Sequence, residues 1–353
     1  MKPKLLIYVA AILAAIGVGV FVFKGVAPAV ILPSEPIFQI GPWAVRNTIL
    51  TSWLVIVFLV VTSLLATRGM ALVPVRSLQN FVEALLEWMY GIVEDAAGPA
   101  NARRFFPLIG TIFLYVVCSN WFGLLPFYGT FGRVSTPEVA PGQTGRAVAL
   151  QTYHLGPLPI AVEPLNPKPI ELKSSPSGDV ERTDGQPLAR SDGTPTAGTI
   201  VPFFRSVFSD ANAPLSIAII SFIAVEYWGL STLGVGTYLG KFFNLKALAR
   251  GPMGAIDVVV GLLELISEFV RVISFTFRLL GNIFAGEVLI IYMTFLVPFI
   301  IPTLFYGLEL FVGFIQASVF ALLTLVFAVM AVEHHESHEQ HHAGQEQIEL
   351  EPA

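Results

Sequence analysis

Charge-poor stretches of about 20 residues recur along this chain and limit what it can fold into. An α-helix of that length covers the hydrocarbon core of a bilayer, which is about 30 Å thick. The stretches are continuously apolar rather than alternating, and this favours membrane helices over a membrane barrel. Only 13% of the residues are charged and 54% are hydrophobic, whereas roughly 25% are charged in an ordinary soluble domain. The sequence therefore predicts an all-α polytopic membrane protein.

About six membrane spans are expected from the apolar runs. They fall at about residues 5–23, 47–67, 105–127, 210–232, 255–297 and 303–331. The last two are separated by a turn at Pro298 and Pro302, which predicts a long tilted helical hairpin at the C-terminal end. The first run is long for the core of a secretory signal and lacks a good cleavage site after it. We therefore expect it to be a retained helix.

The segments between the spans have different characters. Residues 75–96, "VRSLQNFVEALLEWMYGIVEDA", alternate apolar and acidic residues at helical spacing and predict one amphipathic surface helix. Residues 128–208 are polar and rich in Pro and Gly, so we expect an irregular extramembrane insert with short strands near 147–172. The tail, 332–353, holds five of the six histidines beside glutamates. A solvated, partly disordered tail is favoured over a metal site.

These segments give a domain organisation and an orientation. The predicted parts are an extra N-terminal helix with its linker (1–40), two spans around the amphipathic helix (41–127), the insert (128–208), one span with the C-terminal hairpin (209–331) and the tail (332–353). With six spans, the basic residues of the short loops all fall on one side, which the positive-inside rule makes cytoplasmic. Both termini are then cytoplasmic and the insert lies outside.

Ionisable residues within the predicted hairpin are functional candidates, because a charge near the bilayer centre costs about 3 kcal/mol or more. At about 100° and 1.5 Å per residue, Glu287 lies on the face opposite Arg278 and about 13 Å to its outer side. Glu264 falls about 21 Å to the inner side, and Asn282 within about 40° of the same face. Carboxylates therefore lie both outward and inward of a central cation.

Pairing separates these charges into two groups. Glu264, Glu268 and Arg271 are close in spacing, and a structural salt bridge and a functional role are equally open for them. Arg278 has no acid three or four residues away on its own helix, although an arginine stays protonated in any protein environment. We infer that its anion comes from another chain.

The last span adds a second set of polar residues. Glu309 and Gln316 are seven residues apart and share a helix face. If the two helices are antiparallel about the Pro298 turn, Glu309 comes near the level of Glu287 and Gln316 near that of Arg278.

At these residues the chain resembles subunit a of the F-type rotary ATP synthases. "SFTFRLLGNIFAGE" is similar to the signature of that family, with Arg278 in the place of the stator arginine and Asn282 and Glu287 completing the pattern. "SNWFGLLP", "SDANAPLSIAI", "GLLELISEFVRVIS" and "FIQASVFALLTLVF" resemble other family segments, and the likeness spans about residues 45–331. In these segments, the polar positions of the family are matched by Asp210, Asn212, Glu264 and Gln316.

The resemblance implies a mechanism with two aqueous half-channels that do not meet. Protons enter from outside by way of Glu287 and Glu309, with the polar residues Asp210 and Asn212, and leave near Glu264. Arg278 attracts the ionised carboxylate of a c subunit and blocks leakage between the channels, with Gln316 and Asn282 beside it. The family often has an acid and a histidine where this chain has Glu287 and Glu309, so here two facing acids are expected to couple.

The resemblance also implies partners and a location. The chain would be a stator subunit that couples proton translocation to ring rotation, beside a c ring, a b-subunit peripheral stalk and the remaining synthase subunits, in a bacterial plasma (inner) membrane. GxSxG and Walker-type motifs are absent, so no nucleotide chemistry, metal or cofactor is expected on this chain. The net charge of -5 gives no reason to expect nucleic acid binding. A proton-coupled secondary transporter is the alternative, although the inverted repeats and broken helices of that class are not visible.

Overall fold

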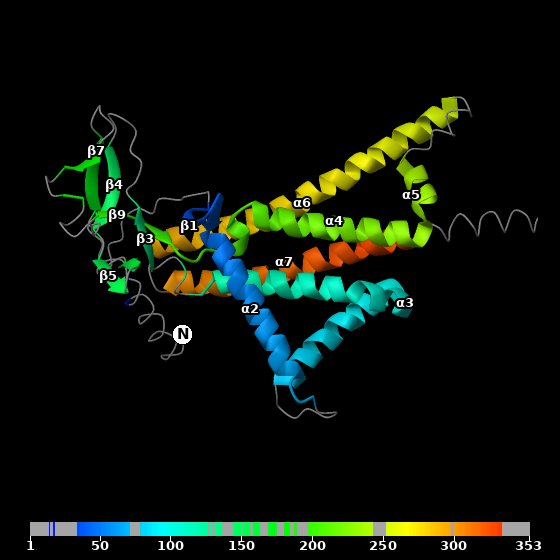
Figure 1. Ribbon diagram of the computed structural model, residues 1–353, viewed down its shortest axis with the longest axis horizontal. Coiled ribbons are helices and arrows are strands. Elements are labelled where there is room, and N and C mark those ends of the chain that lie inside the picture. The colour runs from blue at the N-terminus through cyan, green and yellow to red at the C-terminus, as the bar shows by residue number, and fades with distance from the viewer. Residues whose placement is uncertain are drawn as a thin grey trace, which may run out of the picture. The chain divides into compact units, whose positions relative to one another are not determined.

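The computed structural model describes residues 14, 17, 34–70, 78–125, 128, 131–135, 144–149, 151–155, 158–162, 169–174, 180–183, 187–188, 197–242, 252–297 and 300–333. Its long helices are α2 (Asn47–Thr67), α3 (Leu78–Gly123), α4 (Asn212–Leu233), α6 (Pro252–Leu296) and α7 (Ile300–Glu333), shown in Figure 1. They coincide, to within a few residues at most ends, with five of the predicted spans. The sixth, at 5–23, lies outside the described residues except for 14 and 17.

Four helices in the described part of the chain are long and apolar enough to cross a membrane. They are α2, α3, α4 and residues Ile301–Val332 of α7. Together with the 45-residue α6, they make the described chain a mostly helical membrane protein. The prediction of a polytopic helical protein is confirmed at this level.

Contacts divide the chain into two compact units. The first, here called the sheet unit, comprises Met1–Val57, Cys118–Asp210 and Gly281–Phe314. The second, the helical unit, comprises Phe58–Val117, Ala211–Leu280 and Ile315–Ala353. The long helices α2, α3, α6 and α7 contribute residues to both units, so each unit is described by itself.

Helix α3 joins two elements that the sequence predicts as separate. It runs from the predicted amphipathic segment into the third span and is bent at Gly98, whose φ of 75° and ψ of 161° are not helical. Glycine adopts that positive φ without a steric penalty, and Pro99 suits the first position of the helical segment that follows. The bend therefore lies where the sequence places a helix stop and a helix start side by side.

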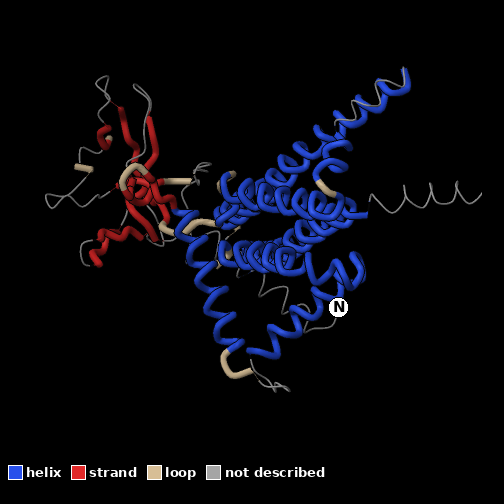
Figure 2. Tube along the Cα trace, turned by 45° about the vertical axis from the view of Figure 1, so that its right-hand side comes forward, coloured by secondary structure: helices blue, strands red, loops and turns tan. Residues whose placement is uncertain are grey.

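The insert is more regular than predicted. Its strands (red in Figure 2) are β3 (Phe131–Ser135), β4 (Thr144–Ala149), β5 (Gln151–Leu155), β6 (Leu158–Val162), β7 (Pro169–Ser174), β8 (Val180–Arg182) and β9 (Ala197–Pro202). They form a seven-stranded antiparallel sheet in the order β5-β6-β3-β9-β4-β7-β8. The sequence analysis expected an irregular insert with short strands only near 147–172, and that expectation was wrong.

The physical reason for the sheet is visible along β7. Ile170 and Leu172 are buried, whereas the alternate residues Glu171 and Lys173 are exposed. This alternation is the pattern of a strand with one covered face. Ala147 of β4 joins the same apolar cluster.

Two short elements were not predicted at all. Strands β1 (Pro36–Ile40) and β2 (Trp43–Arg46) form an antiparallel hairpin just before α2. Helix α5 (Val235–Phe242) follows Gly234, which ends α4 with a φ of 78°. Within the helical unit α5 packs on α4, where the hydroxyl of Tyr238 donates to Glu226 at 2.7 Å.

Aromatic and polar contacts hold the helices of each unit together. In the helical unit, Phe105 of α3 stacks on Trp228 of α4, with ring centroids 4.5 Å apart, and Phe275 of α6 on Phe320 of α7 at 4.8 Å. In the sheet unit, the Asn120 amide at the end of α3 donates to the carbonyl of Gly313 on α7 at 2.9 Å. These contacts fix the helix segments that carry the candidate site.

Candidate functional site

An ion pair joins two charged residues of α6 within one turn of the helix. Arg271 Nη1 lies 2.6 Å from Glu268 Oε2, and Arg271 Nη2 donates to Glu268 Oε1 at 2.9 Å. The guanidinium carbon of Arg271 also lies 3.6 Å from the ring centroid of Phe327 on α7. Of the two possibilities open for these residues, the salt bridge is the one present, and Glu264 is half-buried four residues before it.

Arg278 has a different environment. Its Nη1 is buried and has no hydrogen-bond partner among the described residues. Its guanidinium carbon lies 5.4 Å from the ring centroid of Phe275, and that ring supplies no formal charge. The absence of an acid three or four residues from Arg278 on its own helix was predicted, and no described acid forms an ion pair with it.

Two amides predicted to accompany Arg278 are also unsatisfied. Gln316 on α7 is 9% exposed, and its Nε2 is buried without a partner in the described part of the chain. The same holds for the Nδ2 of Asn282. Buried polar groups are usually hydrogen-bonded, so such a set calls for an explanation such as water or another molecule.

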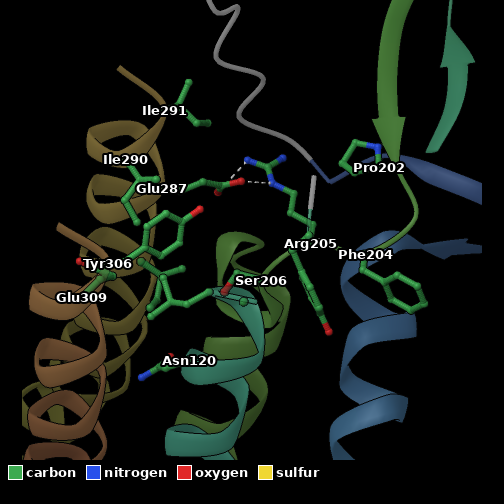
Figure 3. A pocket seen from close by; sticks show the side chains of 14 residues that line it. Asn120, Pro202, Phe204, Arg205, Ser206, Glu287, Ile290, Ile291, Tyr306 and Glu309 are labelled. Atoms are coloured by element: carbon green, nitrogen blue, oxygen red, sulfur yellow. Dashed lines mark hydrogen bonds and ion pairs between the residues drawn. The ribbon is translucent and has the colours of Figure 1, made fainter. Parts of the chain in front are cut away.

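A cavity of about 260 Å³ lies within the sheet unit. Its walls come from the end of α3, the segment after β9, α6 and α7, and its lining residues include Tyr128, Arg205, Glu287, Tyr306 and Glu309. Figure 3 shows Glu287 and Arg205 facing each other, with Tyr306 and Glu309 below them in this view. The register expected for an antiparallel hairpin is thereby confirmed for Glu287 and Glu309.

Glu309 is packed against the backbone of α6. It is 8% exposed, and its Oε1 is buried without a hydrogen-bond partner among the described residues. A Cβ at Gly286 would lie 2.6 Å from Glu309 Oε2 and closer still to Oε1. Glycine at 286 therefore makes room for the carboxyl of Glu309.

Glu287 is held by an arginine that the sequence analysis missed. Arg205 Nε donates to Glu287 Oε1 at 3.0 Å, and Arg205 Nη2 donates to Oε2 at 3.2 Å. The Arg205 side chain is only 10% exposed, against 27% for Glu287. The available signal was a lone arginine in the apolar run "VPFFRSVF", which lies 82 residues before Glu287.

Two predicted residues lie elsewhere. Asp210 accepts hydrogen bonds from the Ser34 hydroxyl and from Arg46 Nη1, the latter at 3.3 Å. Asn212 begins α4, where its carbonyl accepts a hydrogen bond from Ser216. Neither is among the residues that line the cavity.

Burial shifts the acid–base behaviour of two groups outside the spans. Burial raises the pKa of Tyr128, so its phenol stays neutral where it lines the cavity. Burial also raises the pKa of Glu35, and the positive charges of Arg205 and Arg133 partly oppose that rise. Arg205 thus lies in the electrostatic field of more than one acid.

No cluster of three or more metal-ligating side chains occurs among the residues that the structure describes. The His-rich tail predicted at 332–353 lies outside them from residue 334 onward.

The fold and the site define a class of protein: a multi-pass helical membrane protein with buried ionisable groups on its long C-terminal helices. Residues 49–329 match the family described as ATP synthase A chain. The chain belongs to that family.

Curated relatives agree with the family assignment. The chain is similar to ATP synthase subunit a of Gloeobacter violaceus, at 28% identity over 85% of this chain and 89% of the relative. It is also similar to ATP synthase subunit a of Moorella thermoacetica, at 23% identity over 85% of this chain and 96% of the relative. Membership makes it a proton-translocating stator subunit of an F-type ATP synthase, without nucleotide chemistry of its own and assembled with other synthase subunits.

Proposed function

We propose that this subunit forms two proton half-channels against a ring of c subunits, with Arg278 as the electrostatic barrier between them. The observation that carries the proposal is the buried Nη1 of Arg278, which lacks a partner in the described part of the chain. A buried cationic nitrogen without a partner is unfavourable, because removing one partner of a fully buried ion pair costs about 3–5 kcal/mol. An ionised carboxylate on a c subunit would supply the missing anion each time it passed.

The outer half-channel in this proposal runs through the cavity of the sheet unit. Glu287 and Glu309 line that cavity and are its acidic groups, so we give them the uptake of protons from the outer side. Asp210 and Asn212 fall outside the cavity and have no step in this route. Gln316 and Asn282 accompany Arg278, and Glu264 serves the release of protons on the inner side.

The proposal includes a topology and a set of partners. Both termini face the cytoplasm, residues 128–208 face outward, and the protein lies in a bacterial plasma membrane beside the c ring and the b-subunit stalk. Cysteines placed in the insert and at position 2 should react with an impermeant maleimide from opposite sides of sealed cells. Labelling of both from the same side would contradict the topology.

Replacement of the barrier residue tests the function. We expect Arg278→Ala to abolish ATP synthesis driven by a proton gradient in vesicles, with normal membrane insertion. Arg103→Ala is a matched control, because Arg103 is exposed on α3. Wild-type synthesis by the Arg278→Ala enzyme would overturn the proposal.

Copurification separates the proposal from a proton-coupled transporter. A c ring, a b stalk and the peripheral ATPase subunits should accompany the tagged chain in mild detergent. A chain that purifies alone or as a homo-oligomer would instead support the transporter.

A further inference from the structure

The two glutamates of the outer cavity differ in charge compensation. Glu287 receives two hydrogen bonds from the guanidinium of Arg205, one on each carboxylate oxygen. Glu309 has no ion pair among the described residues, and its Oε1 is buried without a hydrogen-bond partner. The two acids therefore cannot be equivalent stations for a proton.

Paired geometry of this kind favours the ionised form of a carboxylate. Two parallel hydrogen bonds from a guanidinium to a carboxylate are among the strongest polar contacts in proteins. A proton that binds Glu287 must displace one of them, in a site where the arginine side chain is 10% exposed. A proton that binds Glu309 displaces no such contact.

We propose that Arg205 is a positioning residue that keeps Glu287 ionised and thereby directs proton uptake through Glu309. The inference rests on the proposed function of the cavity as the outer half-channel. In this scheme Glu287 stays in its ion pair with Arg205 and does not take up protons, and Glu309 gains and loses them. Arg205 reaches Glu287 from the segment after β9, so the insert takes part in shaping the channel.

Several other groups face this pair. Tyr306 and Glu309 approach from α7, and Tyr128 approaches from the turn after α3. Glu35 and Arg133 act on each other electrostatically, and Glu35 also feels the charge of Arg205. Arg133 on β3 does not line the cavity, which makes it a matched control for Arg205.

The test uses the complete ATP synthase in liposomes, with synthesis measured against the pH on the uptake side at constant driving force. The variants are Arg205→Gln, Glu287→Gln, the double variant, Glu309→Gln and the control Arg133→Gln. We expect Arg205→Gln to lower the rate about tenfold, as befits the loss of a charge-assisted contact, and to change the shape of the pH profile. Glu287, without its cation, then competes for protons.

The double variant Arg205→Gln/Glu287→Gln is the decisive test of the inference. Removal of both charges should return the rate to within about threefold of wild type and restore the wild-type pH profile, because no competing acid remains. Arg133→Gln should match wild type in the rate of ATP synthesis and in its pH profile. A normal rate and profile for Arg205→Gln, or a double variant no better than Arg205→Gln, would overturn the inference.

Two further outcomes separate this inference from the proposed function. If the Glu309→Gln enzyme synthesises ATP at the wild-type rate, the cavity is not the proton path, and the part of the proposed function that assigns the outer half-channel to it fails. If Glu309→Gln is inactive while Arg205→Gln is normal, only the role of Arg205 fails. Should Arg205→Gln not assemble, Arg205→Lys replaces it, with an intermediate rate expected for a single-point contact and a wild-type rate contradicting the inference.

Discussion

Arg271 and Arg278 lie two turns apart on the same side of α6, yet their surroundings differ. Arg271 is in contact with Glu268, at 2.6 Å, and stacks on Phe327. Arg278 has a buried Nη1 with no partner among the described residues, and its guanidinium carbon lies 5.4 Å from the Phe275 ring centroid. The charge of Arg271 is neutralised within the helical unit. The charge of Arg278 has no such partner among the described residues and is available to a group from another chain.

The contrast indicates what each charge is for. A cation that serves stability is paired inside the chain, since an uncompensated charge in the membrane is expensive. A cation kept without a partner is available to a carboxylate that arrives from outside. Arg205 is likewise paired, with Glu287, and its proposed role is to position that acid rather than to receive a carboxylate from another chain.

The largest effect is expected when each arginine of α6 becomes lysine. Arg278→Lys should lower proton-driven ATP synthesis about a thousandfold, equivalent to about 4 kcal/mol, because a buried ammonium can lose its proton. Arg271→Lys should stay within about threefold of wild type, because lysine can keep the contact with Glu268. Equal losses in the two variants would remove the distinction between them.

The next effect is on stability. Glu268→Gln leaves Arg271, whose side chain is 18% exposed, without its anion and should lower the free energy of unfolding by about 3 kcal/mol. The double variant Glu268→Gln/Arg271→Gln should lose less, since no uncompensated charge remains. Detergent titration followed by circular dichroism measures both. A double variant less stable than Glu268→Gln would show that the pair stabilises the fold by more than neutralising each other's charge.

A smaller effect is expected from a single methyl group at the outer cavity. Gly286→Ala would push a Cβ into the carboxyl of Glu309 and should lower the synthesis rate about tenfold. Gly307→Ala on α7 is the control, because a Cβ there meets nothing within 4 Å. Equal activity of the two variants would mean that the position of Glu309 is unimportant.

The smallest effect concerns Glu35, outside the spans. Because its pKa is raised in the folded protein, the folded state binds this proton more tightly than the unfolded state, and stability falls as pH rises through that range. Glu35→Gln should therefore be more stable than wild type at neutral pH, with the difference vanishing below about pH 4, where the unfolded carboxyl is also protonated. An identical pH dependence of the thermal midpoint in Glu35→Gln and in wild type would contradict this expectation.

The helices and the register of the last two were predictable from the sequence. Hydropathy located the spans, and one assumption, an antiparallel hairpin, was enough to bring Glu309 to the level of Glu287. These features depend on local periodicity, which a single sequence carries.

The features that the sequence did not predict depend mostly on contacts between residues far apart in the chain. Arg205 meets Glu287 across 82 residues of chain, and no local pattern reports such a pair. The strands of the insert are short and lie between sequence segments rich in Pro and Gly, so composition concealed their alternation. Helix α5 has only eight residues, too few for a clear periodic signal.

The most direct test of the central claim is a cross-link between Arg278→Cys and a cysteine in place of the ring carboxylate, in a synthase whose single native cysteine, Cys118, is replaced by Ala. A disulfide requires Cα atoms within about 7 Å, and position 271 is about 10 Å further along the helix. The account predicts a subunit a–subunit c product on oxidation from position 278 and none from Arg271→Cys. A product from position 271 alone, or from neither, would contradict it.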